Sequence, residues 1–270
     1  MTIVTQLSVP NPQSAGLPAY QLPTPGERAI LAHPNVRNWW RADRGLTAEG
    51  WKCWKTGKPL AKERASVPAR RKLGAYNDQD ACVFTPTTQL WAPNVVPVGG
   101  PYSIVAAGRA GTNDSAFLAG GATQASTAKM YLRHQSVTGN GRVAFFHNYE
   151  DGSDATKRSL LAASMSHMYE AGPMLMIGSH DHLAAAVMGL RINGGHIVDM
   201  TGNPAEALTP NVCGELHVGG VNAFGAAIGG AVENGDLRHI IICDVGLHVA
   251  TELRDLIETE LNSQDDYWVA

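Results

Sequence analysis

The chain has 270 residues and a formal net charge of −3, from 21 basic and 24 acidic side chains. A net charge this small gives no electrostatic indication of a nucleic-acid partner. Apolar residues make up 44% and charged residues 17%, and Gly (29) and Pro (15) are plentiful, which favours a sandwich or barrel over a helical fold. We expect no membrane insertion, because no apolar run approaches the ~20 residues that a span needs.

Charge and proline are unevenly distributed at the start of the chain. Residues 1–26 carry no charge, and Glu27 is the first charged residue. Because several prolines crowd this stretch, we expect residues 1–35 to form an extended arm without regular structure. Its apolar side chains need cover from the arm's own domain or from a neighbour, which makes the segment a candidate assembly arm: Leu7, Val9, Leu17, Tyr20 and Leu22.

Basic residues dominate the segment that follows, and acidic residues dominate the end of the chain. Residues 28–72 hold 12 of the 21 basic residues and three acids, whereas residues 199–270 hold 12 acids and two arginines. Two interpretations stay open: differently charged solvated faces, or complementary contact between copies or neighbours. The absence of a basic residue ahead of an apolar run near Met1 indicates no secretory signal, so we expect synthesis in a host cytoplasm.

From residue 81 the chain reads as short strands separated by turn signals. In 142–147, Val143, Phe145 and His147 share one face, as expected for a strand with a period of two. Asn193-Gly194 predicts a tight hairpin, because both residues tolerate positive φ. Residues 41–79 read as irregular, and the predicted strands are 81–85, 102–108, 115–119, 129–135, 142–147, 173–179, 184–192, 196–200, 214–219 and 237–245.

One segment, residues 250–261, has the spacing of a helix. Leu253, Leu256, Ile257 and Leu261 form one apolar stripe, and Arg254 with Glu258 adds an i,i+4 pair on the expected solvent side. These patterns predict an all-β sandwich or barrel over residues 36–270 with a short C-terminal helix.

Two clusters are candidate ligand-binding sites. The first is Glu150, Asp151 and Asp154, either a solvated turn or a loop for a sugar or Ca²⁺, which prefers oxygen ligands. The second is His180, Asp181 and His182, either a polar hairpin tip or part of a metal site whose further ligand cannot be read. We expect His217 and His239 to be satisfied histidines within apolar strands.

Aromatic residues and cysteines are expected to be structural. Five tryptophans fall in the first third of the chain, where they either fill the core and anchor the arm or form an aromatic platform for a sugar: Trp39, Trp40, Trp51, Trp54 and Trp91. The four cysteines, Cys53, Cys82, Cys213 and Cys243, include no Cys-x-x-Cys motif, so buried free thiols are expected.

The second half of the chain resembles concanavalin-A-like and laminin-G-like domains. The similar segments, in order, are residues 173–178 (PMLMIG), the polar turn 179–182, residues 185–194 (AAVMGLRING), residues 215–220 (ELHVGG), residues 229–243 and the loop and helix from Asp244. Trp40-Arg-Ala-Asp43-Arg-Gly-Leu is similar to the opening of versions found in tailed phages, although Trp54-Lys-Thr-Gly lacks the Asp of that pattern.

This resemblance implies a two-sheet antiparallel jelly-roll sandwich that binds carbohydrate or protein, with Ca²⁺ in some members and catalysis in a minority. The chain lacks the Glu-x-Asp-x-Glu carboxylates of the glycosidases, so we expect no enzyme and no required cofactor. The sequence favours a structural or binding protein of a phage virion, in the tail, baseplate or receptor-binding position, whose partners are other virion proteins and copies of itself. Alternatives are a capsid decoration protein, a free carbohydrate-binding lectin module and a polysaccharide-degrading enzyme.

Overall fold

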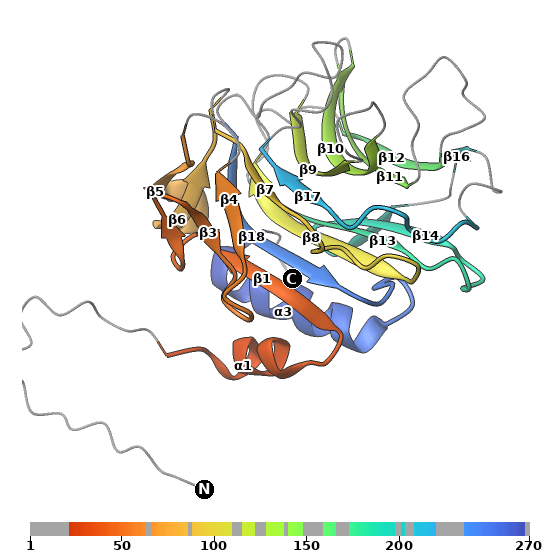
Figure 1. The fold of residues 1–270 in the computed structure, drawn as a ribbon, viewed down its shortest axis with the longest axis horizontal. Coiled ribbons are helices and arrows are strands. Elements are labelled where there is room, and N and C mark those ends of the chain that lie inside the picture. Colours follow the sequence, from red (N-terminus) through yellow and green to blue (C-terminus); the bar gives the residue numbers. More distant parts are fainter. Residues whose placement is uncertain are drawn as a thin grey trace, which may run out of the picture.

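The computed structural model describes residues 22–62, 66–85, 88–109, 115–121, 128–137, 140–147, 159–165, 173–197, 201–202, 208–219 and 235–267. Two β-sheets lie face to face, and two helices cover the outer face of one of them (Figure 1). Every pair of named strands is antiparallel, which confirms the predicted two-sheet sandwich with a C-terminal helix.

The first sheet has the order β15-β14-β13-β8-β18-β6-β5, and β1 also pairs with β18. Its central strands, β8 and β18, are paired along almost their whole length, from Asp236 opposite Arg109 to Cys243 opposite Ser103. The strands of this sheet are β1 (Val36–Arg41), β5 (Ala69–Leu73), β6 (Gln79–Val83), β8 (Tyr102–Arg109), β13 (Met174–His180), β14 (Met188–Ile192), β15 (Gly195–Ile197) and β18 (Asp236–Cys243).

The second sheet has the order β16-β12-β11-β10-β9-β17-β7-β4-β3-β2. Its strands are β2 (Leu46–Thr47), β3 (Gly50–Lys52), β4 (Pro59–Lys62), β7 (Leu90–Ala92), β9 (Ser115–Gly121), β10 (Ala128–Val137), β11 (Asn140–His147), β12 (Ser159–Met165), β16 (Thr201–Gly202) and β17 (Leu216–Val218). A short 3-10 helix, η2 (Gly74–Tyr76), joins β5 to β6.

The strand predictions agree with the structure in most places. The Asn193-Gly194 turn joins β14 to β15, and both residues have positive φ, 49° and 74°. Two predictions are wrong: β14 begins at Met188 rather than at residue 184, and residues 41–79 contain β2 to β5 rather than irregular chain. Strands β1, β7, β12 and β16 were not predicted either.

Two cores lie on opposite faces of the first sheet. In β8, Tyr102, Ile104 and Ala106 face the second sheet, while Val105 and Ala107 face the helices. Because both faces are covered, the central strands are apolar at nearly every position, as in sheets buried on both sides. Trp40 and Trp51 belong to the core between the sheets, whereas Trp39 belongs to the core under the helices.

The C-terminal helix α3 (Thr251–Asp265) packs Leu253, Ile257 and Leu261 into the second of these cores, as the sequence predicts. Leu256 is only partly buried. The Arg254–Glu258 pair forms at 3.8 Å, but Glu258 is buried, because its carboxylate also accepts from Arg191 at 2.8 Å. The expectation that this pair lies on the solvent side is therefore wrong for Glu258.

A second helix, α1 (Pro25–Ala32), corrects the expectation that residues 1–35 are extended throughout. Thr24 caps it and Glu27 completes a capping box, which satisfies N–H groups at the helix start. Pro25 occupies the first turn, where its missing N–H costs nothing and its fixed φ suits a helix. Pro25 is one of the prolines on which the prediction of an extended arm was based, and in the structure it helps to begin a helix.

The remaining expectations concern which side chains are buried and which are exposed. All four cysteines are free and buried, and His217 and His239 are buried within their strands. Leu22 is 80% exposed, and Leu7, Val9, Leu17 and Tyr20 lie outside the described residues. Within the described part of the chain, no helix is long and apolar enough to cross a membrane.

Candidate functional site

One end of the sandwich gathers histidines from both sheets. His147 ends β11 in the second sheet, and His180 ends β13 in the first. Their rings stack with centroids 3.5 Å apart and planes 14° apart. Both side chains are fully buried, so this histidine stack closes one end of the core between the sheets.

The stack holds His147 in its neutral form. Its Nε2 lies 2.9 Å from the carbonyl oxygen of Thr209, and its Nδ1 lies 3.0 Å from the hydroxyl of Tyr102. A carbonyl only accepts, so Nε2 carries the proton and Nδ1 accepts from the hydroxyl. Burial, and then the neighbouring His180, lower the pKa of His147 to about 3, so this histidine is neutral at physiological pH.

The second predicted cluster contributes His180 to this stack, and its other two residues follow His180 in the chain. His180 is buried at the end of β13, which makes the interpretation as a polar hairpin tip wrong for this residue. His182 lies parallel to it at 6.2 Å. Asp181 accepts from the backbone N–H of Leu183 at 3.0 Å, and Leu183 is 82% exposed at the tip of the loop.

The first predicted cluster follows His147 in the sequence. Glu150, Asp151 and Asp154 lie outside the described residues, so their proposed Ca²⁺ or sugar loop stays a prediction. The segment that carries them begins directly after His147. Among the described residues, no group of three His, Cys, Asp or Glu side chains is placed to hold a metal ion.

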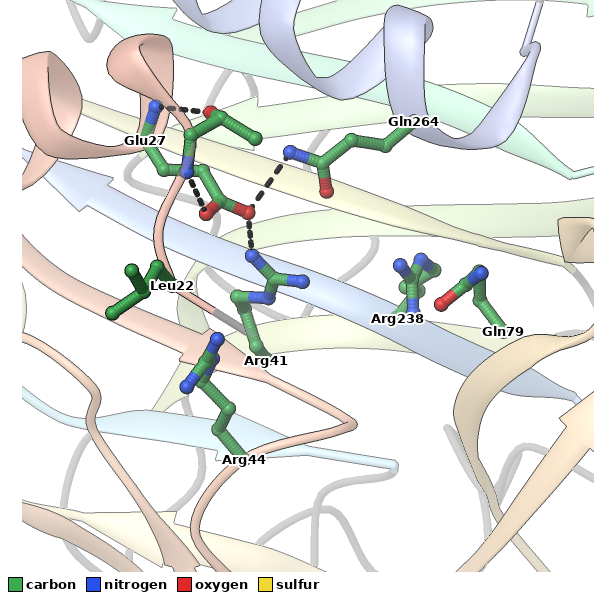
Figure 2. A pocket seen from close by; sticks show the side chains of 8 residues that line it. Leu22, Glu27, Arg41, Arg44, Gln79, Arg238 and Gln264 are labelled. Atoms are coloured by element: carbon green, nitrogen blue, oxygen red, sulfur yellow. Dashed lines mark hydrogen bonds and ion pairs between the residues drawn. The ribbon is translucent and has the colours of Figure 1, made fainter. Parts of the chain in front are cut away.

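A second candidate site is a pocket of about 350 Å³ on the helix side of the first sheet (Figure 2). It lies where α1, α3 and the ends of β1, β6 and β18 meet. Its lining is polar except for one aliphatic side chain, and consists of Leu22, Thr24, Glu27, Arg41, Arg44, Gln79, Arg238 and Gln264.

Glu27 ties three elements together at this pocket. Its carboxylate accepts from the backbone N–H of Thr24 at 2.8 Å, from Gln264 of α3 at 3.0 Å and from the Arg41 guanidinium at the end of β1. Figure 2 shows the carboxylate between Arg41 and Gln264. Only 3% of Glu27 is exposed, so the ionic contact is largely shielded from water.

The two buried arginines of the pocket are paired with carboxylates. Arg41 donates to both oxygens of Asp43, at 2.9 and 3.0 Å. Burial alone would raise the pKa of Asp43, but the charge and hydrogen bonds of Arg41 hold it below the ordinary value. Arg238 donates to Asp265 at 2.5 Å, and His239 lies 3.1 Å from the same carboxylate. These pairs fix the inner wall.

Arg44 forms the outer wall. Its guanidinium lies 4.5 Å from the ring centroid of Trp54, in cation–π geometry. Trp54 in turn packs against Trp39, with ring centroids 5.0 Å apart. Trp54 therefore acts as a support for arginine, which agrees with the structural role expected for it.

Sequence reasoning found the histidine end but missed the pocket. The Thr24-Pro-Gly-Glu27 spacing is a readable capping signal, yet nothing in the sequence connects Glu27 with Gln264 or Arg41 with the helices. These contacts depend on tertiary packing, and Glu27 and Gln264 are more than 200 positions apart in the sequence.

The geometry defines a two-sheet jelly-roll sandwich, and its described residues form two candidate sites, the histidine stack and the pocket beside α1. No protein-family model matches the sequence, and no curated protein sequence matches it. Solved structures do match. The binding domain of botulinum neurotoxin DC in complex with SialylT superposes with a TM-score of 0.53 at 8% identity, covering 86% of this chain and 52% of that one.

Two further solved structures are similar to the same extent. The botulinum neurotoxin DC binding domain in complex with rat synaptotagmin II has a TM-score of 0.51 at 10% identity, over 86% of this chain and 52% of that chain. Trypanosoma rangeli sialidase in complex with sialic acid has a TM-score of 0.53 at 11% identity, over 85% and 34%. The chain thus spans from a third to about half of these proteins, and the likeness shows the fold alone.

Proposed function

We propose that the protein is a non-catalytic binding protein that recognises a cell-surface glycan with its loop end. The observation that carries this proposal is the buried stack of His147 and His180, beside which Asp181 and His182 of the same predicted cluster begin a loop. A rigid, buried stack supports an exposed loop that offers carboxylate and imidazole groups, and such groups suit the hydroxyls of a sugar. Two of the similar structures support the same ligand class, because one is a neurotoxin binding domain in complex with SialylT and the other a sialidase in complex with sialic acid.

We further propose that residues 1–21 join the domain to an assembly, of which a phage virion is the favoured case. The support is the firm attachment of α1 to the sandwich through Glu27, immediately after this segment. Leu22, at the start of the described chain, faces solvent, so a connection there would not disturb the fold. A capsid decoration role would use the same attachment.

The binding part of the proposal is tested on an array of defined oligosaccharides. The wild-type protein should bind a subset of the glycans, and Asp181→Asn combined with His182→Ala should abolish that binding at an unchanged melting temperature. Asp78→Asn, in the turn between η2 and β6, serves as the control and should bind as the wild type does. Full binding by the double variant would contradict a site at the loop end.

The absence of catalysis is tested with the glycans that bind. No oligosaccharide should be released on prolonged incubation, as measured by mass spectrometry. Turnover that disappears on Glu150→Gln or Asp151→Asn would show that the predicted loop is an active site instead.

A further inference from the structure

The pocket beside α1 has the size and lining of a ligand site. Its volume of about 350 Å³ falls within the range of small-molecule sites, roughly 300–1,000 Å³. The pocket and the histidine stack are built from different strand ends of the first sheet. The pocket is lined by the end of β1 and the start of β6, whereas the stack lies at the end of β13. A ligand here would make contacts additional to those of the loop end.

The inner part of the pocket is prearranged, because its two arginines are held by three carboxylates. Arg41 is paired with Asp43 and Glu27, and Arg238 is paired with Asp265. These guanidinium groups cannot swing away without leaving buried carboxylates unpaired, which is costly. They form a stiff wall, and we assign them a positioning role.

Two further arginines, Arg28 and Arg70, contact the chain close to the pocket but do not line it. Arg28 donates to the backbone carbonyl of Pro23 at 2.7 Å, and Arg70 contacts that of Asp43 at 3.5 Å. Within the described residues, neither has a carboxylate within 4.0 Å. Glu260 is the acidic side chain on this side, and Thr24 and Gln264 already donate to it, at 2.5 and 2.7 Å.

One buried acceptor of the pocket has no hydrogen bond in the described structure. The side-chain amide of Gln264 donates to both Glu27 and Glu260, at 3.0 and 2.7 Å. Because carboxylates only accept, the NH₂ group must face them, and Oε1 must point the other way. This Oε1 is buried without a partner. Buried polar atoms are nearly always satisfied, so a ligand hydroxyl is a fitting donor.

From these observations we infer that the pocket binds an acidic sugar, with its carboxylate at Arg44 and a hydroxyl at Gln264 Oε1. The planar, weakly hydrated guanidinium matches a carboxylate in geometry, and Gln79 supplies a further amide for hydroxyls. The inference rests on the proposed recognition of glycans and narrows the ligand to those with a carboxylate-bearing residue.

The test is calorimetric titration of the full chain with glucuronate, with glucose and with inorganic phosphate. We expect glucuronate to bind and glucose to bind about tenfold more weakly or less, and we expect rising salt to weaken the glucuronate complex but not the glucose complex. Equal binding of glucuronate and glucose would overturn the inference, and so would tighter binding of phosphate than of glucuronate or no binding of glucuronate.

Matched variants locate the effect. Arg44→Gln should reduce glucuronate affinity about tenfold, because a charge-assisted hydrogen bond is lost. Arg70→Gln, fully on the surface, should weaken binding and reduce its salt dependence even if Arg44→Gln unfolds the protein. Arg71→Gln, its exposed neighbour whose side chain points to the other face of β5, should bind as the wild type does.

Failure here can be distinguished from failure of the proposed function. If these variants bind glucuronate unchanged, the pocket inference is wrong, while loss of array binding by the Asp181 and His182 double variant would still uphold recognition at the loop end.

Discussion

At the scale of single residues, burial of neutral histidines links stability to pH. His147 lies in the histidine stack with a pKa of about 3, and His239 lies under the helices with a pKa of about 4. Burial is the largest cause in both cases. In the unfolded chain each would titrate near 6.5. Between these pKa values the unfolded state therefore binds more protons than the folded state. The free energy of unfolding falls as the pH falls from about 6.5 toward the folded pKa values.

The free energy of unfolding should therefore change measurably with pH. Each buried histidine should lower the free energy of unfolding by about 1.4 kcal/mol per pH unit between pH 6 and pH 4.5. Urea unfolding of His147→Gln across this interval should show a slope smaller by that amount than the wild-type slope. Parallel curves for the two proteins would mean that His147 is protonated in the fold.

At the scale of elements, α3 packs against the first sheet with only part of its apolar stripe. The sequence places Leu253, Leu256, Ile257 and Leu261 together, but Leu256 sits at the margin, partly exposed, while Ile257 is fully buried. The reason is that a stripe about 100° wide has edges, and only the tertiary fold decides which edge faces the sheet.

The two neighbouring positions provide a direct comparison. Ile257→Ala should cost about 2–5 kcal/mol, the range for large-to-small changes in a core. Leu256→Ala should cost less, because less of its surface is removed from water. Chemical denaturation of both variants measures the difference, and an equal or larger loss for Leu256→Ala would contradict this packing.

The first helix, α1, is fixed both by its apolar face and by a buried charge. Ile30 is fully buried in the core under the helices, and Glu27 binds Arg41 and Gln264. Glu27→Ala would leave Arg41 with Asp43 as its remaining partner. We therefore regard the helix as part of the folded domain.

At the scale of the whole molecule, this attachment moves the start of the folded unit from residue 36 to about residue 22. Deletion of residues 1–21 should leave the melting temperature unchanged, because the capping box and the ion pair that hold α1 begin at Thr24 and Glu27. Deletion of residues 1–35 should lower it by about 4 °C or more, because Ile30 and the Glu27 contacts are lost. Calorimetry of the two truncated proteins measures this.

The same truncations test the role of the N-terminal segment. The protein that lacks residues 1–21 should keep its glycan binding but lose its association with copies of itself or with particle proteins, as seen by ultracentrifugation. Association that is equal to that of the full chain would show that this segment is not an assembly device.

Much of the fold could be read from local signals. The period of two in residues 142–147 and the Asn193-Gly194 turn each depend on neighbouring residues only, and both agree with the structure. The strands in residues 41–79 were missed because they are short, with only two residues in β2 and three in β3, too few to show a period of two. Short strands of this kind are defined by pairing and not by their own pattern.

The sequence by itself determined the sandwich, the buried thiols, the C-terminal helix and the membership of His180, Asp181 and His182 in one cluster, because strand periodicity, helical spacing and turn chemistry are local. Only the tertiary structure decided that His147 stacks on His180, that Glu27 joins α1 to Arg41 and Gln264, and that three arginines surround a pocket. These contacts join segments far apart in sequence, and their energy comes from burial and charge pairing that exist only once the two sheets and two helices have come together.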